Sequence, residues 1–401
     1  MKTVAVLGAG NSGKTLAADA ALAGHEVRLF EFPEYAASIR NLRKTRKIRV
    51  VGKQVNAEGF VREGVVILDH VGSDMAKVVS GADIIAVSVR ALSYEKLFGA
   101  LVPHLEDGQV VAIFPDNFGS FVLRKKIAES GRRVQVTVGG WSSLPYGCRV
   151  IRDHDISEVN IIYRAVNLRG DALPSSDRSV FFDAMQEFAP MDTVDPIAGD
   201  TMVDVGFCNV NPILHVPAVL LNLGAIDNWG VIDHVGSRDV YFNIYRHGFS
   251  EHVSKVQYAI YLEELEIAEK MGIELQKYDR KVFFSRLGIL GPEFMGEGYT
   301  TPLEQNMPDF YQPVYFPGER FSPQSRYITE DIPVGCHLFY QFAKRFGVKV
   351  PVIESMIRLG STVSGVDYFS KGMTLKDLGV ENMSNDELLR FLREGDQLLM
   401  P

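Results

Sequence analysis

The first thirty residues after Lys2 read TVAVLGAGNSGKTLAADAALAGHEVRLFEF (residues 3–32) and already indicate a fold class. A strand-forming apolar run, Val4 to Leu7, leads into the pattern GxGxxG at residues 8–13, and an Ala/Leu-rich helical segment follows as far as Gly24. Glu26 to Phe30 has the composition of a second strand. The order strand, glycine turn, helix, strand predicts a βαβ unit of the kind that binds a dinucleotide.

The glycines of this turn suit the binding of a pyrophosphate. Gly8 permits a tight turn, Gly10 lets the backbone approach the phosphates, and Gly13 allows close packing of helix on strand. The free N–H groups at the start of the helix add donors for the phosphates. A P-loop is disfavoured, because GNSGKT lacks the four-residue spacing between its glycines. We therefore expect a cofactor-binding loop made of Gly8, Ala9, Gly10, Asn11, Ser12 and Gly13.

Glu31 ends the second predicted strand and favours NAD over NADP. Its carboxylate can accept a hydrogen bond from the adenosine ribose 2′-OH and would repel a 2′-phosphate. A competing observation is a run of basic side chains that could reach a 2′-phosphate, namely Arg40, Arg43, Lys44, Arg46, Lys47 and Arg49. We favour a solvated helix face and strand edge for that run.

Further apolar runs extend the α/β pattern. Residues 83–89 and 109–114 predict parallel strands buried on both faces, and residues 134–138 predict another strand. The expected fold is an α/β, Rossmann-type, doubly wound parallel sheet over residues 1–195.

Ligands of such sheets bind beyond the carboxyl ends of the strands. Val89 and Arg90 follow one predicted strand and are assigned to the cofactor. Asn117 follows the next strand, and we assign it to the substrate site.

From about Pro196 helical patterns replace the strands. Ser250 and Gly272 mark the start and end of one expected helix. Others are expected over residues 211–222, over residues 329–346 with Pro333 in the first turn and Gly347 at the end, and from Pro351 onwards. We therefore predict a second, mainly α-helical catalytic domain over residues 196–401.

Composition excludes several classes of protein. The 401 residues carry 42 Lys and Arg against 50 Asp and Glu, a net charge of −8, which disfavours a nucleic-acid partner. Three scattered cysteines indicate neither a disulfide framework nor a metal site. The most apolar stretch, residues 212–226, is too short and too interrupted to span a membrane, and no signal peptide is recognisable. We expect a cytoplasmic protein with no membrane partner, and the sequence leaves a homodimer open.

A histidine in an apolar helix start is the first sign of chemistry. His215, in NPILH at residues 211–215, must be hydrogen-bonded or catalytic to be buried cheaply. A cluster of one guanidinium and two carboxylates, Arg326 with Glu330 and Asp331, lies at a predicted helix start, where simple capping would also explain the acids.

Four motifs together resemble the opine dehydrogenases, the octopine and nopaline dehydrogenase family. They are the glycine loop, LPYGCR at 144–149, NPILH at 211–215 and SRYITEDIPVG at 325–335, with PV at 351–352 continuing the pattern. The resemblance implies a nicotinamide-dependent reductive condensation, in which an amino-acid amine attacks an α-keto acid such as pyruvate and the imine is reduced with NADH.

The resemblance also implies roles for individual residues. His215 would be the acid/base residue, Asp331 would fix its tautomer, and Arg326 would grip the carboxylate of the keto acid. We place Ser142 and Cys148, in and beside the LPYGCR motif, in the substrate site.

One departure from the family pattern bears on the amine donor. Octopine-forming enzymes carry an acid two residues before the Leu-Pro-aromatic run, whereas Ser142 and Ser143 precede Leu144 here. Arginine is therefore disfavoured as the donor, and a smaller neutral or apolar amino acid is favoured. The segment of residues 291–321, rich in Pro, Gly and aromatics, is expected either to line the amine site or to serve domain packing.

Two other functions compete with this one. A dehydrogenase of the same two-domain plan, acting on a 2-hydroxy or keto acid without an amine, would share the fold. A non-catalytic NAD-binding regulator would share the glycine loop but would have no use for an acid/base pair.

Overall fold

The computed structural model describes most of the chain, namely residues 1–54, 56–153, 156–229, 242, 244–280, 283 and 324–395. The chain divides into two compact units. Unit 1 consists of Met1–Cys208 and Leu378–Pro401, and unit 2 of Asn209–Asp377.

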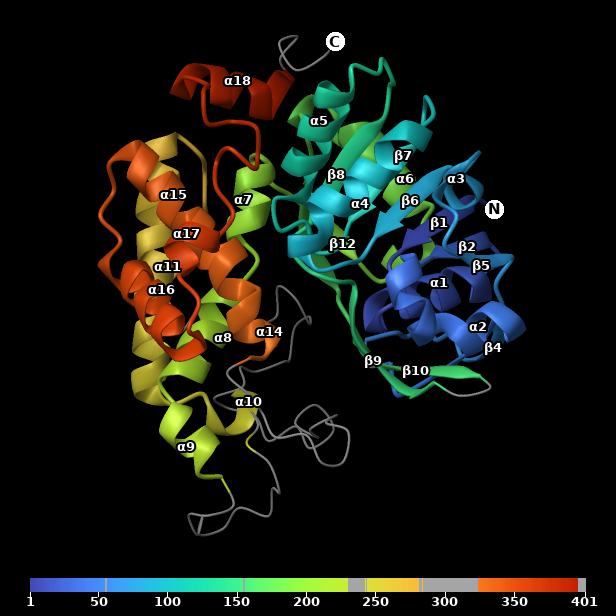
Figure 1. Cartoon of the computed structure of the whole chain (residues 1–401), viewed down its shortest axis with the longest axis horizontal. Coiled ribbons are helices and arrows are strands. Elements are labelled where there is room, and N and C mark those ends of the chain that lie inside the picture. Colours follow the sequence, from blue (N-terminus) through green and yellow to red (C-terminus); the bar gives the residue numbers. More distant parts are fainter. Residues whose placement is uncertain are drawn as a thin grey trace. The chain divides into compact units, whose positions relative to one another are not determined.

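An eight-stranded sheet forms the centre of unit 1 (Figure 1), with the strand order β12-β11-β8-β7-β6-β1-β2-β5. Its strands are β1 (Thr3–Leu7), β2 (Glu26–Phe30), β5 (His70–Gly72), β6 (Ile84–Val87), β7 (Val110–Ile113), β8 (Thr137–Trp141), β11 (Asn167–Ala172) and β12 (Asp195–Ala198). Neighbouring strands run parallel except for β11 and β8. The inner strands are buried along their whole length, as continuous apolar runs require when helices cover both faces. The predicted Rossmann-type sheet is confirmed.

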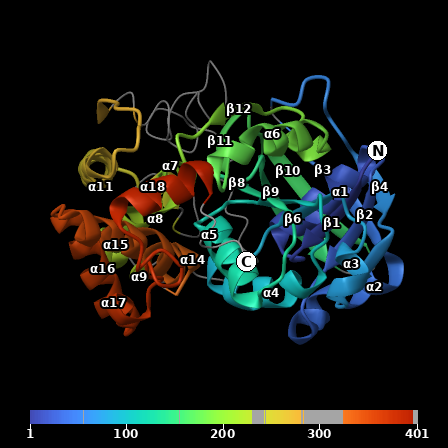
Figure 2. The same cartoon turned by 90° about the horizontal axis from the view of Figure 1, so that it is seen from above.

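Helices flank this sheet on both faces, and α5 and α6 lie on opposite sides of β8 (Figure 2). The helices of unit 1 are α1 (Asn11–Leu22), α2 (Arg40–Thr45), α3 (Met75–Val79), α4 (Tyr94–Leu101), α5 (Gly119–Ser130), α6 (Arg178–Gln186), α7 (Met202–Phe207) and α18 (Asn385–Glu394). Short 3₁₀ helices connect them at Pro33–Ile39, Ala91–Ser93, Val102–His104, Ser175–Asp177 and Ala189–Met191.

A second, four-stranded sheet packs on the other side of α1 and was not predicted. Its order is β4-β3-β10-β9, with β3 (Lys47–Val51), β4 (Gly64–Ile67), β9 (Tyr146–Asp153) and β10 (Ser157–Arg164). Arg164 on β10 donates two hydrogen bonds, of 2.8 and 2.7 Å, to Asp19 on α1, and both side chains are fully buried. A bidentate, desolvated ion pair fixes geometry strongly. It therefore ties the second sheet to the helix that follows the glycine loop.

The described residues of unit 2 form helices, and α11, α15 and α16 lie side by side (Figures 1 and 2). Its elements are α8 (Asn211–Leu220), α9 (Leu223–Asp227), α10 (Ile244–His247), α11 (Glu251–Met271), α14 (Arg326–Thr329), the π-helix η6 (Asp331–Cys336), α15 (His337–Phe346), α16 (Pro351–Ser364) and α17 (Tyr368–Lys371). The predicted signals hold at several ends: Ser250 caps α11, Gly272 and Gly347 end α11 and α15 in the left-handed region, and Pro351 opens α16.

The predicted helix over residues 329–346 is wrong in its first half. Thr329 ends α14 instead of capping a new helix, and its hydroxyl donates to the Ser325 carbonyl at 3.1 Å. A π-helix follows, and α15 begins only at His337. Pro333 has no N–H to give to the carbonyl of Thr329, so the α-helical hydrogen-bond ladder is interrupted at this point.

The last described residues return to unit 1. Phe391 on α18 packs against Phe121 on α5, with ring centroids 6.2 Å apart, and Arg393 pairs with Asp200 at 3.3 Å. Within the described residues, one helical stretch, Met202–Leu220, is long and apolar enough to cross a membrane by length and composition. Since 83% of it is buried inside the protein, it has the character of core helices.

Candidate active site

A histidine and a carboxylate face each other in unit 2. His215 on α8 is 2% exposed, and its Nδ1 lies 2.8 Å from Oδ2 of Asp331, the first residue of the π-helix. The side chain of Asp331 is 13% exposed, so the pair is nearly sealed from water. A carboxylate at Nδ1 selects the tautomer that carries its proton there, and such an imidazole exchanges protons through Nε2.

The short helix α14, just before the π-helix, carries Tyr327 and Arg326. The ring of Tyr327 on α14 packs on the imidazole, with centroids 4.0 Å apart, and was not anticipated. Arg326, the first residue of α14, is exposed. A planar guanidinium can hold such a carboxylate through two parallel hydrogen bonds.

The glycine loop in unit 1 has the shape of a phosphate cradle. Gly8 has a φ of +101°, which an L side chain rarely adopts, and a Cβ there would lie 2.5 Å from the Ser88 carbonyl oxygen. Gly13 packs so closely on Gly8 that a side chain is excluded, whereas a Cβ on Gly10 would meet no atom within 4 Å. The open space at Gly10, before the N-terminus of α1, fits the pyrophosphate of a dinucleotide.

Hydrogen bonds from neighbouring strands fix this loop. Ala9 N donates to Oε2 of Glu31 at 2.9 Å, which ties the loop to the end of β2. Val150 N on β9 donates to Oδ1 of Asn11 at 2.8 Å. The second sheet thus supports the loop that sequence analysis assigned to the cofactor.

The other predicted cofactor residues are placed at the same sheet edge. Val89 contacts Gly8, since a Cβ on that glycine would lie 2.6 Å from its Cγ1, and Arg90 is exposed. The backbone N–H of Phe32 holds the second oxygen of Glu31 at 2.9 Å. All six basic side chains of the competing run are exposed, on α2, on β3 and at the residue between them, as a solvated face requires.

The predicted substrate residues of unit 1 differ in accessibility. Asn117 follows β7, is half-buried and has a φ of +43°. Ser142 is 8% exposed and donates its backbone N–H to the Arg169 carbonyl at 2.8 Å. Cys148 lies on β9 and is 2% exposed. Residues 291–321, the segment considered for the amine site, lie outside the described residues.

A buried acid, Asp116, lies beside Asn117 in a segment that follows a predicted strand, but the sequence assigned it no role of its own. Asp116 has no exposed surface, and its carboxylate accepts hydrogen bonds from Ser120 N at 3.0 Å and Ser120 Oγ at 3.1 Å. Burial raises the pKa of this carboxyl to about 7, against the effect of the donors from Ser120 and Phe118. The sequence contains a hint of this role. An aspartate just after a buried strand costs free energy to bury unless hydrogen-bond donors hold its carboxylate.

A second unanticipated acid lies in the core of unit 2. Glu264 on α11 is fully buried, and no hydrogen-bond partner for either carboxylate oxygen is found among the described residues. Burial and the charge of Glu263 raise its pKa well above the ordinary value. Burial raises the pKa of the Cys336 thiol, at the end of the π-helix, and the charges of Asp331 and Glu264 add to the rise.

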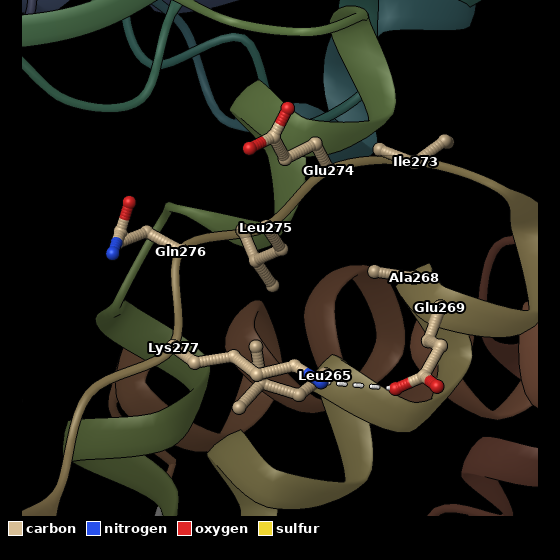
Figure 3. A pocket seen from close by; sticks show the side chains of 8 residues that line it. All are labelled: Leu265, Ala268, Glu269, Ile273, Glu274, Leu275, Gln276 and Lys277. Atoms are coloured by element: carbon tan, nitrogen blue, oxygen red, sulfur yellow. Dashed lines mark hydrogen bonds and ion pairs between the residues drawn. The ribbon is translucent and has the colours of Figure 1, made fainter.

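A pocket of about 340 Å³ lies elsewhere, at the C-terminal end of α11 (Figure 3). Lys277 and Glu269 form an ion pair across it at 3.1 Å, and both side chains are exposed. The proposed chemistry does not involve this pocket, because its lining contains none of the predicted site residues.

Comparison with known proteins agrees with this geometry. Residues 198–364 match the family described as NAD/NADP octopine/nopaline dehydrogenase, alpha-helical domain. The chain is 23% identical over 389 residues to an opine dehydrogenase of Arthrobacter sp. (strain 1C), covering 96% of each protein. It is 26% identical over 387 residues to a vitopine synthase of Allorhizobium ampelinum, covering 95% of this chain and 96% of that protein.

Comparison with solved structures bears on the fold. An octopine dehydrogenase crystallised with NADH and pyruvate superposes with a TM-score of 0.71 at 20% identity, covering 97% of this chain and 98% of that one. The fold is therefore shared along almost the whole length. The helical-domain match and the full-length relatives therefore make this chain similar to opine dehydrogenases along almost its whole length.

Proposed function

We propose that this protein is an NAD(H)-dependent opine dehydrogenase, which joins the amine of an amino acid to an α-keto acid, with pyruvate as the favoured keto acid, and catalyses the reverse oxidation. The observation that carries the proposal is the buried His215–Asp331 pair, 2.8 Å apart, in a chain whose other unit is a dinucleotide-binding sheet. A protein that only sensed NAD would gain nothing from such a pair.

The reaction requires two proton transfers and one hydride transfer. The amine nitrogen bonds to the keto carbon, the carbinolamine loses water, and the imine carbon accepts a hydride. NADH, when bound, supplies that hydride. The product is a secondary amine with two carboxylates when the donor is an amino acid.

The residues of unit 2 are suited to the proton transfers. His215 delivers a proton to the keto oxygen as the carbinolamine forms and assists its departure as water. Asp331 holds the imidazole by Nδ1 and stabilises its charged form. Arg326 fixes the keto-acid carboxylate, so that positioning contributes to the rate.

In unit 1 we propose that the glycine loop binds the pyrophosphate and that Glu31 accepts the ribose hydroxyl. The carboxylate of Glu31 supports NAD over NADP, because it would repel a 2′-phosphate. Comparing Michaelis constants for NADH and NADPH tests this preference. A clear advantage for NADPH would contradict the role of Glu31.

For the amine donor we propose a small neutral or apolar amino acid, because Ser142 stands where octopine-forming enzymes carry an acid. Asn117, Ser142 and Cys148 are the proposed contacts in unit 1. A panel of amino acids against pyruvate, glyoxylate and 2-oxoglutarate identifies the pair of substrates.

The deciding experiment follows NADH absorbance with pyruvate, with and without an added amino acid. We expect oxidation only when both are present. Oxidation without an amine would favour a 2-hydroxy acid dehydrogenase, and NADH binding without any turnover across the panel would favour a regulator.

We also propose a cytoplasmic location, with a homodimer left open. Three free cysteines, Cys148, Cys208 and Cys336, accord with a reducing compartment. Light scattering of the purified protein tests the assembly.

A further inference from the structure

The π-helix that carries Asp331 is wedged between two other helices of unit 2. On one side it packs against α8 and on the other against α16. Ile332 has no exposed surface, and its side chain fills the space over Gly360 on α16. Ile332 therefore holds the π-helix against α8 from the side of α16.

Two hydrogen bonds account for the unusual winding. The N–H of His337 donates to the carbonyl of Ile332, five residues earlier, as in a π-helix. Pro333 has no N–H, and its carbonyl accepts a bond of 2.8 Å from Met373 N. The hydrogen bond from Met373 thus stabilises the wide turn of the π-helix from outside that helix. Such turns are rare and occur frequently at functional sites.

Gly335 is the point of closest approach to α8. A Cβ built on it would lie 2.7 Å from Cβ of Pro212 and closer still to its Cγ. Real carbon atoms do not approach to that distance without moving the backbone, so a side chain at position 335 is incompatible with this packing.

The same two helices meet at a second point, one turn away. Pro212 and His215 are three residues apart on one face of α8, and Asp331 and Gly335 are four residues apart on the π-helix. The contact of Pro212 with Gly335 and the hydrogen bond of His215 with Asp331 therefore share one interface. Any separation of the helices at the first contact is transmitted to the second.

We propose that Pro212 and Gly335 form an interlock that sets the distance between His215 and Asp331, which makes Gly335 a positioning residue for the acid/base pair. The proposal rests on the proposed function for its catalytic consequence. It also explains why the sequence carries a proline three residues before the histidine and a glycine four residues after the aspartate.

The direct test is Gly335→Ala in the full-length protein. The added methyl group forces the π-helix away from α8, and the hydrogen bond of 2.8 Å weakens steeply as it lengthens beyond normal range. We expect kcat to fall roughly 10- to 100-fold, within the range of an impaired general acid/base. The Kd for NADH should stay the same, because the glycine loop belongs to unit 1.

A spectroscopic measurement reports on the pair without any assay. With histidine labelled in ¹⁵N, the Nδ1 proton of His215 should give a strongly downfield signal in the wild type, which His215→Gln identifies by its loss. Gly335→Ala should weaken or shift this signal. This signal separates a failure of the interlock from a failure of the proposed function. It tests the interlock even if no amine-dependent NADH oxidation is found.

A compensating variant removes the opposing atoms. Pro212→Gly eliminates all three carbons that the new methyl group would meet, so Gly335→Ala/Pro212→Gly should recover most of the kcat and the downfield signal. If Gly335→Ala alone does not fold, recovery of folding and activity in the double variant supports the interlock. Failure of a folded double variant to recover either would overturn it.

Gly360→Ala is the matched control on the opposite side of the π-helix. Its new methyl group meets the far end of the Ile332 side chain, which can turn aside. We expect a loss of thermal stability with kcat within about threefold of the wild type.

For Gly335→Ala itself, an unchanged kcat and an unchanged downfield signal would also contradict the proposal.

Discussion

The imidazole of His215 has one nitrogen committed to Asp331, and the most direct prediction concerns the residue itself. His215→Ala should lower turnover about 100-fold or more, because a positioned general acid/base contributes 10²- to 10⁴-fold. Steady-state kinetics with the best substrate pair measure the loss.

NADH binding serves as the control for His215→Ala. Fluorescence titration should give an unchanged Kd, because His215 lies in unit 2. Turnover within a few-fold of the wild type would make His215 a core histidine whose hydrogen bond is only structural.

Arg326 should act on affinity more than on rate. Arg326→Ala removes the bidentate partner of the keto-acid carboxylate, so KM for pyruvate should rise at least tenfold. Arg326→Lys keeps the positive charge but loses the planar guanidinium. Its KM for pyruvate should lie between those of the wild type and of Arg326→Ala. An unchanged KM for pyruvate with several amine donors would exclude this role.

At the scale of elements, the turn that precedes α5 combines strain with a buried charge. Asn117 and Phe118 both have a positive φ, at +43° and +60°, which costs of order 1–3 kcal/mol each. Hydrogen bonds from Ser120 N and Oγ to Asp116 hold this turn. Tyr94 supports it from α4 by donating to the Pro115 carbonyl at 3.0 Å.

Asp116→Ala should therefore destabilise unit 1 at about pH 4, where the Asp116 carboxyl is protonated in the folded protein and its ionisation does not yet reduce stability. It leaves the N–H and hydroxyl of Ser120 without their acceptor and releases the strained turn, for a loss of about 1–3 kcal/mol in the free energy of unfolding. Denaturation in urea measures it. Ser120→Ala removes only one of the donors and should cost less; an equal loss in both variants would locate the effect in the hydroxyl alone.

The elements differed in how far sequence could predict them. The strands β1, β2, β6 and β7 are continuous apolar runs, and α11 has recognisable signals at both ends. The second sheet lacks such signals. In β3 basic residues alternate with apolar ones, and the basic run suggested a solvated helix face and strand edge. Its partner β10 lies far away in the sequence. The π-helix depends on Met373 and on packing against Pro212, neither of which the local pattern contains.

The candidate site was predictable to a similar degree. Motifs that resemble the family's identify His215, Asp331 and Arg326. The sequence alone does not show that His215 and Asp331, far apart in the chain, lie 2.8 Å apart. Asp116 belongs to no motif, and its importance appears only with its burial. The predicted boundary after residue 195 falls before α7, whereas the compact units divide after Cys208.

For the whole molecule, buried acids predict how stability depends on pH. The pKa of Asp116 is raised to about 7 and that of Glu264 is raised well above its ordinary value, so these two sites bind more protons in the folded protein than in the unfolded chain above about pH 4. Each group should reduce the free energy of unfolding by up to about 1.4 kcal/mol per pH unit until its folded pKa is passed.

Glu264→Gln tests this directly. Removing the ionisable group should flatten the fall in stability between pH 5 and pH 8, measured by urea denaturation across that range. Glu269→Gln is the matched control, because Glu269 is an exposed carboxylate on the same helix. Equal slopes for the wild type and Glu264→Gln would show that Glu264 ionises in the folded state as readily as in the unfolded chain.

The return of the chain to unit 1 after Asp377 has a consequence for biosynthesis. Leu388, Phe391 and Leu392 of α18 are buried, and Phe391 packs on α5. A ribosome makes Met1–Cys208 first, yet that unit lacks this covering until the helical unit has also been translated. Unit 2 is thus inserted in the sequence between the two parts of unit 1. While unit 2 is being translated, the apolar surface that α18 later covers stays exposed on unit 1. We expect chaperones to be needed most during this interval.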